Sequence, residues 1–190
     1  MIQLRRGTSA LHRQLESLPG LQRVFAQDYR MPEYIALLRA LYSVFRPLEA
    51  DLLDSAPMVA GDLGYRPRCT DLESDLVALA ADLPVVDRGV PRASTRSAAA
   101  QVGCLYVLEG SRLGGKVIAR QLASTLSLSP DRGMRFFAGS PGANGPDWLQ
   151  FCRRAESLCG SPPARKAAVV AAAATFTLFY EQLSYECPVT

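Results

Sequence analysis

Apolar residues recur at three- and four-residue steps along most of the chain, which is the period of an amphipathic α-helix. Residues 4–16 show this spacing, with Leu4, Leu11 and Leu15 beside polar positions. Pro32 suits the first turn of a second such helix, because the backbone N–H that proline lacks has no helical partner there. The apolar positions after this proline are Tyr34, Leu37, Leu38, Leu41, Phe45, Leu48 and Leu52. Both segments are predicted to be helices.

Two further helices are predicted from their end signals. One begins at the capping box Thr70-Asp71-Leu72-Glu73, whose first and last side chains can each satisfy a free backbone donor, and ends near Leu83. The other begins at Ser161-Pro162-Pro163 and runs to about Tyr185, since prolines are tolerated in a first turn and alanine favours helix. Its strongly apolar sequence predicts a buried core helix.

Two segments rich in glycine and proline, residues 57–67 and 139–146, are expected to be loops. The apolar run 102–108 fits a buried strand or a buried helix. The interpretation depends on the residues that follow it. No hairpin dipeptide and no internal repeat is found. The chain is therefore predicted to be one all-α domain.

Composition narrows the function without naming one. The chain has 190 residues, 48% of them hydrophobic and 21% charged, which suits one globular domain with a proper core. A formal charge of +3 is too mild for a nucleic-acid binder and leaves an acidic protein partner open. Five cysteines without a CxxC pair favour free thiols in a reducing cytoplasm. Charged residues interrupt the N-terminal segment, so secretion is not expected, and no apolar run is long enough to predict a membrane span.

Residues 110–116, GSRLGGK, have the glycine and lysine spacing of a phosphate-binding loop. Such a loop needs Ser or Thr after the lysine to bind magnesium, but Val117 stands there. We therefore favour one long helix over residues 98–126, in which each glycine lowers helix stability by about 1 kcal/mol relative to alanine. A closely packed neighbouring helix or a flat ligand against the backbone would each explain these glycines. The residues alone leave both explanations open.

His12 is the only histidine of the chain, so Ser-His-Asp triads and sites with several histidine ligands are excluded. Arg5, Thr8, His12 and Glu16 fall along one stripe of the predicted first helix. A single histidine beside leucines is more often structural or solvated than a metal ligand. The stripe by itself does not decide between these roles.

Four motifs, in their order along the chain, resemble the haem oxygenases. They are Thr8, His12 and Glu16 at four-residue steps, the aromatic and leucine pattern of residues 34–49, the segment LYVLEGSRLGG at 105–115, and the pattern of Thr175, Phe176, Phe179 and Leu183. Together they extend over most of the chain. The LEGSxLGG form looks most like the bacterial branch associated with bacteriophytochromes. Animal-type enzymes have Gly-Asp where this chain has Gly110-Ser111, so a carboxylate that would organise distal water is missing.

The resemblance implies a single-domain, haem oxygenase-like helical bundle over residues 1–190, with haem between the first, proximal helix and a glycine-kinked distal helix. His12 would then ligate the iron, and Glu16 would hold its other ring nitrogen. Arg5, on the same stripe as Thr8, would meet the haem propionates. The distal catalytic segment would consist of Gly110, Ser111, Gly114 and Gly115. Further haem contacts are expected from Tyr106, Arg154 or Arg153, Phe176 and Phe179.

The implied reaction is the oxidative cleavage of haem (heme b, iron protoporphyrin IX), as cofactor and substrate, by O2 and electrons from an external reductant. The expected products are biliverdin, as the IXα isomer, with CO and Fe2+. The expected partners are a ferredoxin or flavoprotein reductase, met by the outward-facing Arg112 and Lys116, and a bacteriophytochrome as biliverdin acceptor, with no nucleic acid and no membrane. A non-catalytic haem carrier is the alternative, because it would keep His12 without needing a glycine backbone against one haem face.

Overall fold

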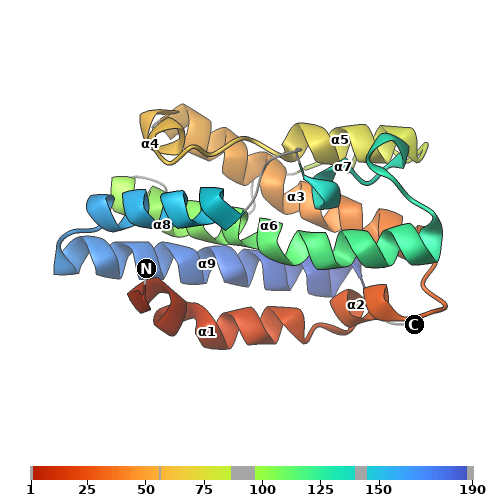
Figure 1. Cartoon of the computed structure of the whole chain (residues 1–190), viewed down its shortest axis with the longest axis horizontal. Helices are drawn as coiled ribbons and strands as arrows, with labels where there is room; N and C mark the ends of the chain where they lie inside the picture. The colour runs from red at the N-terminus through yellow and green to blue at the C-terminus, as the bar shows by residue number, and fades with distance from the viewer. Residues whose placement is uncertain (1, 56, 87–96, 140–144, 188–190) are drawn as a thin grey trace.

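The structure is a computed structural model, and it describes residues 2–55, 57–86, 97–139 and 145–187. Every element in these ranges is helical, and the helices lie along one another in an elongated bundle (Figure 1). The prediction of an all-α fold is confirmed. In chain order the elements are α1 (Ile2–Glu16), α2 (Pro19–Gln22), η1 (Arg23–Phe25), α3 (Met31–Ser55), α4 (Pro57–Asp62), α5 (Cys69–Ala78), α6 (Ala98–Leu126), η2 (Pro130–Arg132), α7 (Arg135–Ala138), α8 (Gly145–Leu158) and α9 (Pro162–Glu186).

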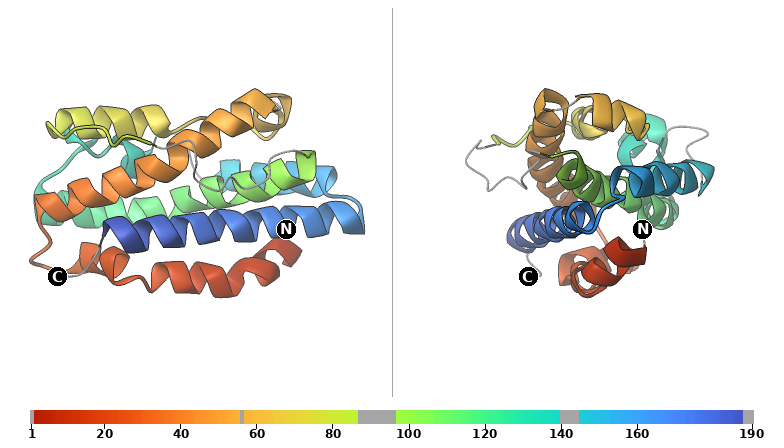
Figure 2. Two further views of the ribbon diagram at one scale, coloured as in Figure 1. Left: turned by 180° about the vertical axis from the view of Figure 1, so that it is seen from behind. Right: turned by 90° about the vertical axis from the view of Figure 1, so that its left-hand side faces the viewer.

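Helix α9 is central to the packing of the bundle, because it contacts α1, α3 and α6. The end-on view in Figure 2 shows α1 and α6 on different sides of it. Its contact with α6 is close: a Cβ at Gly103 would lie 2.1 Å from the carbonyl oxygen of Ala168. Only glycine permits that approach of the two backbones. The prediction of a core helix is confirmed, but only one face of it is buried, since Val170 is 60% exposed and Tyr185 is 81% exposed. Within the described residues α9 is also the one helix long and apolar enough to pass for a membrane span by length and composition.

The other long helices also agree with the sequence pattern. Helix α6 runs without a break from Ala98 to Leu126, and the Ser97 side chain accepts a hydrogen bond from the N–H of Ala100. The run 102–108 is therefore helical. Residues 110–116 lie inside this helix and not between a strand and a helix, so the phosphate-loop alternative is wrong.

The loop predicted at residues 57–67 is partly wrong, because residues 57–62 form α4. Ala60 and Leu63 are buried in the core, and this burial outweighs the turn-forming composition of the segment. In the second predicted loop, α8 already begins at Gly145, and residues 140–144 lie outside the described residues.

The predicted capping box of α5 is also wrong. The helix begins at Cys69, with Arg68 in the N-cap position and no side-chain cap from the residues around it. The cap comes from another helix: the Glu49 carboxylate of α3 accepts hydrogen bonds from the backbone N–H groups of Arg68 (2.7 Å) and Cys69 (2.9 Å). The helix ends at Ala78 and not near Leu83, because the chain turns through Ala80 at a φ of 53°.

Candidate functional site

The stripe on α1 brings His12 and Glu16 into contact. The Nδ1 atom of His12 lies 3.1 Å from Oε2 of Glu16, and the two side chains are 55% and 65% exposed. When Nδ1–H donates to this carboxylate, the lone pair of Nε2 is free to bind a metal. Within the described residues no cluster of three His, Cys, Asp or Glu side chains competes as a metal site.

Of the two phenylalanines predicted to contact haem, only one lies against this histidine. The Phe176 ring of α9 lies 5.7 Å from the His12 ring, edge to face. Phe179 packs instead against Phe45 of α3 at 5.5 Å, inside the core. Phe176 therefore supports the histidine ring from α9, whereas Phe179, which is just as buried, packs on α3.

Tyr106 of α6 connects the two helices on which the site was predicted. Its phenol lies within hydrogen-bonding reach of the Thr8 side chain, and burial is the main cause that raises its pKa, while the charge of Arg5 lowers it. Thr8 is buried and donates to the carbonyl of Leu4 at 2.8 Å. Tyr106 of α6 thus meets Thr8 of α1, and the charge of Arg5 acts on its phenol.

The three glycines of the 110–115 segment of α6 have different surroundings. A Cβ at Gly115 would lie 3.4 Å from the carbonyl oxygen of Phe137, so this glycine serves the packing of α7. A Cβ at Gly110 would lie 3.7 Å from the Trp148 ring, whereas one at Gly114 would meet nothing within 4 Å. The open face of the helix is therefore at Gly114, bordered by Trp148, and its backbone is accessible to a flat ligand.

Trp148 was not predicted, because nothing in the residues around it marks the start of α8. Its ring stacks on Phe151 at 5.5 Å and lies 5.6 Å from the ring of Tyr106. These contacts fix the indole beside the glycine segment.

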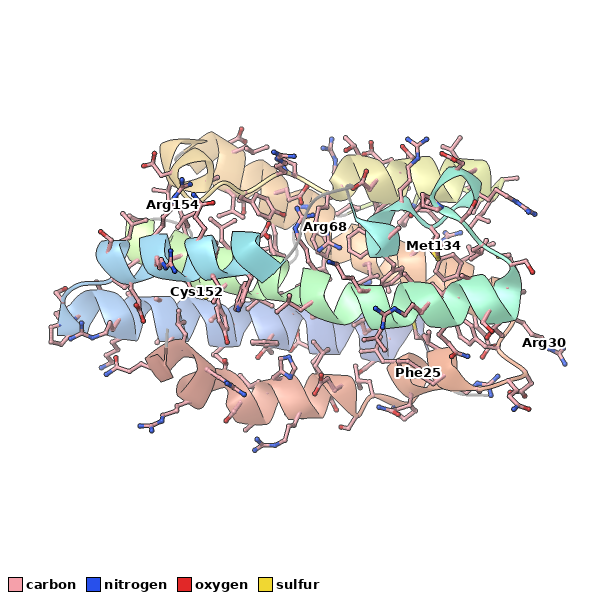
Figure 3. The ribbon with its side chains drawn as sticks, viewed as in Figure 1. Phe25, Arg30, Arg68, Met134, Cys152 and Arg154 are labelled. Carbon is pink, nitrogen blue, oxygen red and sulfur yellow. The ribbon has the colours of Figure 1, made fainter. Side chains whose placement is uncertain are left out.

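Ser111 is held by an arginine that sequence reasoning also missed. Its hydroxyl donates to the Leu108 carbonyl at 2.7 Å and accepts from the guanidinium of Arg68 at 2.8 Å. Arg68 is only 2% exposed and lies between α5, α6 and α7 (Figure 3). No pattern distinguishes this arginine in sequence from its exposed neighbour Arg66.

Arg154 is engaged elsewhere. Its guanidinium donates to the carbonyl oxygen of Asp62 at 2.7 Å, so it fastens α8 to the end of α4 (Figure 3). The charge of Arg5, in contrast, acts to lower the raised pKa of Tyr106 on the distal helix. The sequence offered Arg5, and after it Arg153 or Arg154, for the propionates. Arg153 is exposed on α8 and Arg154 is bound to the Asp62 carbonyl, so Arg5 remains the candidate on the stripe of His12.

The bundle has the fold of solved bacterial haem oxygenases. It superposes on the enzyme from Neisseria meningitidis with a TM-score of 0.81 at 22% identity, covering 98% of this chain and 91% of the other. The haem complex of the cyanobacterial enzyme from Synechocystis gives 0.76 at 17% identity, covering 96% and 90%. The chain is thus a single-domain, all-helical protein of the haem oxygenase fold.

The sequence itself agrees with that class. The family model described as heme oxygenase matches residues 1–184. The heme oxygenase of Xanthomonas campestris is 33% identical over 154 residues, which is 80% of this chain and 90% of that protein. The chain belongs to the haem oxygenase family, and its activity is that of a haem oxygenase.

Proposed function

We propose that the substrate haem binds between α1 and α6, with Nε2 of His12 as the axial ligand of its iron. The contact between His12 and Glu16 carries this assignment, because it fixes the ring and the neutral tautomer that iron requires. Phe176 supports the ring from α9. When bound, haem supplies both the iron that activates O2 and the ring that is cleaved.

The distal residues of this chain shape and solvate the opposite face. The open surface at Gly114 lets the helix backbone approach the porphyrin, and Trp148 limits that surface at Gly110. Ser111 stands where animal-type enzymes have a carboxylate. The proton path therefore consists of the Ser111 hydroxyl, nearby backbone groups and ordered water. The crowded distal side directs oxidation to one meso carbon.

The rim of the site is built by Arg5, Thr8 and Tyr106. Arg5 meets the propionates as a cation, and we assign this role to it and not to Arg154, whose guanidinium is bound to the Asp62 carbonyl. Tyr106 and Thr8 link the proximal and distal helices at this edge.

The products in this proposal are biliverdin IXα, CO and Fe2+, made in the cytoplasm with electrons from a ferredoxin or a flavoprotein reductase. A bacteriophytochrome is the proposed biliverdin acceptor, on the likeness of the LEGSxLGG segment to that branch. The solved relatives support the ligand chemistry, since the Neisseria structures are of NO- and CO-bound enzyme and the Synechocystis structure is of a haem complex.

The direct test is to titrate the purified protein with hemin and then add a reductant in air with catalase present. Loss of the Soret band and chromatography of the pigment monitor the reaction, and catalase excludes free peroxide as the oxidant. One biliverdin isomer, IXα, is expected from a stoichiometric complex. A mixture of isomers contradicts the proposed steering, and binding without conversion favours a carrier.

A matched pair of glycine variants tests where the haem lies. Gly114 and Gly61 both lie in helices with open space at the Cβ position. Alanine at either position is expected to stabilise the haem-free protein by up to about 1 kcal/mol. Only Gly114→Ala should also weaken hemin binding and slow turnover, because its methyl group projects toward the porphyrin. Equal hemin affinity in both variants contradicts the proposed site.

A further inference from the structure

Arg68 has an unusual position for a charged side chain. It is the largest of the fully buried side chains, and its guanidinium lies 3.9 Å above the centre of the Phe136 ring. Its nitrogens donate to the Ser111 hydroxyl (2.8 Å), to the Leu108 carbonyl (3.4 Å) and to the Phe136 carbonyl (3.0 Å). The group therefore ties α7 to the distal helix next to Gly110.

The charge of this guanidinium is not neutralised by direct contact. The described residues give it a hydroxyl, two carbonyls and aromatic faces, but no carboxylate in ion-pair contact, and its Nε has no partner. The nearby Glu49 carboxylate is occupied by the Tyr65 hydroxyl and by two backbone N–H groups. Burial, and after it the charge of Arg112, lowers the pKa of Arg68 to about 10, against the opposing charges of Glu109 and Glu49, so the group stays charged at neutral pH. A buried, unpaired cation is costly to folding, which points to a role outside stability.

The surroundings hold Arg68 firmly in this place. Its backbone N–H is fixed by Glu49 at the start of α5. The Phe136 peptide that accepts its hydrogen bond is itself held, because the N–H of Phe136 donates to Asp75 at 2.9 Å. Contacts from α3, α5 and α7 thus determine where the guanidinium points.

The hydrogen bonds of Ser111 then determine what its hydroxyl can offer. A serine hydroxyl has one proton and two lone pairs. The proton goes to the Leu108 carbonyl and one lone pair accepts from Arg68, which leaves one lone pair on an exposed side chain. Held in this way, Ser111 accepts a hydrogen bond from distal water and does not donate one.

We propose that Arg68 is a positioning residue of the distal side, which orients the Ser111 hydroxyl as an acceptor and keeps a positive charge behind the glycine segment. This inference rests on the proposed placement of haem against α6. The positive charge favours the loss of a proton from the distal side of the ferric haem complex. The remaining lone pair of the Ser111 hydroxyl accepts a hydrogen bond from the distal water molecule and so fixes its position.

The test measures the pH midpoint of the acid-to-alkaline spectral change of the ferric haem complex. Removing the charge in Arg68→Met raises this midpoint, whereas release of the Ser111 acceptor lowers it. The charge is therefore measured in the Ser111→Ala background, where Arg68→Met is expected to raise the midpoint by about half a pH unit to one unit. Arg68→Lys keeps the charge and should restore at least half of the shift. Arg165→Met is the matched control, because that guanidinium also binds two backbone carbonyls, those of Cys159 and Gly160, and it should not move the midpoint.

Ser111→Ala gives a second, independent readout and remains decisive if Arg68→Met does not fold. The loss of the acceptor should lower the midpoint, because an acceptor favours water, the stronger donor, over hydroxide. The shift caused by Arg68→Lys should be smaller in the Ser111→Ala background, because the two residues act through one contact. An unchanged midpoint in Ser111→Ala, or equal shifts in Arg68→Met and Arg165→Met, overturns the inference. Failure of the wild-type protein to bind hemin at all contradicts the proposed function instead.

Discussion

The two sides of the proposed site are built in opposite ways. On α1, His12 and Glu16 are mostly exposed and lie four residues apart, so their contact belongs to a single helix. Behind α6, Arg68 and Glu49 are 2% and 3% exposed, and the contact between Arg68 and Ser111 joins residues 43 positions apart. One side depends on helix geometry, and the other depends on the packing of four helices.

Because of this difference, haem chemistry and folding stability should depend on different residues. An exposed side chain can be replaced at little cost to folding, because water solvates whatever is lost. A buried polar group cannot, because its partners are left without hydrogen bonds in a medium that does not replace them. Substitutions of the exposed His12 and Glu16 should therefore change haem chemistry alone, whereas substitutions behind α6 should change folding or both.

His12→Ala is expected to abolish the normal ferric haem spectrum and turnover, because the chain has no second histidine to replace the ligand. The free energy of unfolding of the haem-free protein should change by less than about 1 kcal/mol, since the side chain is 55% exposed. Absorption spectra and urea titrations measure the two effects. An unchanged spectrum would contradict the assignment of His12 as the iron ligand. Unfolding of the variant would contradict the expected difference between the exposed α1 side and the buried side behind α6.

Glu49→Gln is expected to lower the free energy of unfolding by about 2 to 3 kcal/mol, because one carboxylate oxygen that accepts buried hydrogen bonds is replaced by a donor. The axial ligand is untouched, so the ferric haem complex should keep its spectrum at temperatures where the variant is folded. Thermal unfolding measures the loss. Glu16→Gln is the control from the exposed side and should leave the unfolding temperature nearly unchanged.

Asp75 should make stability depend on pH. Burial raises its pKa to about 6, against the hydrogen bonds from the N–H groups of Phe136 and Arg135, with Asp71 raising it further and the Arg135 charge lowering it. A folded-state pKa above the unfolded value means that the native state holds the proton more tightly between about pH 4 and pH 6. The free energy of unfolding should therefore fall as pH rises through this window, by about 1 to 2 kcal/mol from this group.

The measurement is a series of urea titrations from about pH 4 to pH 7 on wild type and Asp75→Asn. The variant should be less stable overall and should show a flatter dependence on pH, because the titrating group is gone. Asp131→Asn, at an exposed position in η2, should keep the wild-type slope. Asp28 and Glu33, whose pKa values Arg23 lowers, contribute the opposite slope, so the test is the difference between the two proteins. A stability difference between wild type and Asp75→Asn that does not shrink as pH rises contradicts the raised pKa of Asp75.

Ser111→Ala is expected to have the smallest effect on turnover, a loss of about threefold to tenfold, because one hydrogen bond to ordered water is removed while backbone groups remain. Single-turnover rates with a chemical reductant measure it without involving the natural electron donor. A complete loss of activity would show that the hydroxyl is indispensable and that water and backbone do not share its task.

The sequence predicted the long helices well, because each has its own period and end signal. It placed the start of α6 at Ala98 and its end at Leu126, and it placed α9 after Ser161. It failed where a distant residue decides the local structure. The start of α5 is set by the Glu49 carboxylate and not by the box at Thr70. The short helices α4 and α7 bury Ala60, Phe136 and Phe137 in the core that the long helices provide.

The residues of the site show the same distinction between local sequence patterns and contacts made by distant residues. The stripe of Arg5, Thr8, His12 and Glu16 could be identified from spacing and resemblance, because helix geometry alone places residues four apart on one face. The roles of Trp148 and Arg68 could not, because no local pattern tells a buried arginine or an inward-facing tryptophan from an exposed one.

The sequence alone therefore determined that this chain is a helical bundle with a single histidine on a polar helix stripe and a glycine-rich helix later in the chain. Only the tertiary structure decided that Gly114, and not Gly115, has open space beside it, that Arg154 is bound to α4, and that Ser111 receives a hydrogen bond from a buried cation. Period and capping are properties of neighbouring residues. Burial and the orientation of a hydroxyl depend on groups that the chain brings together only when it folds.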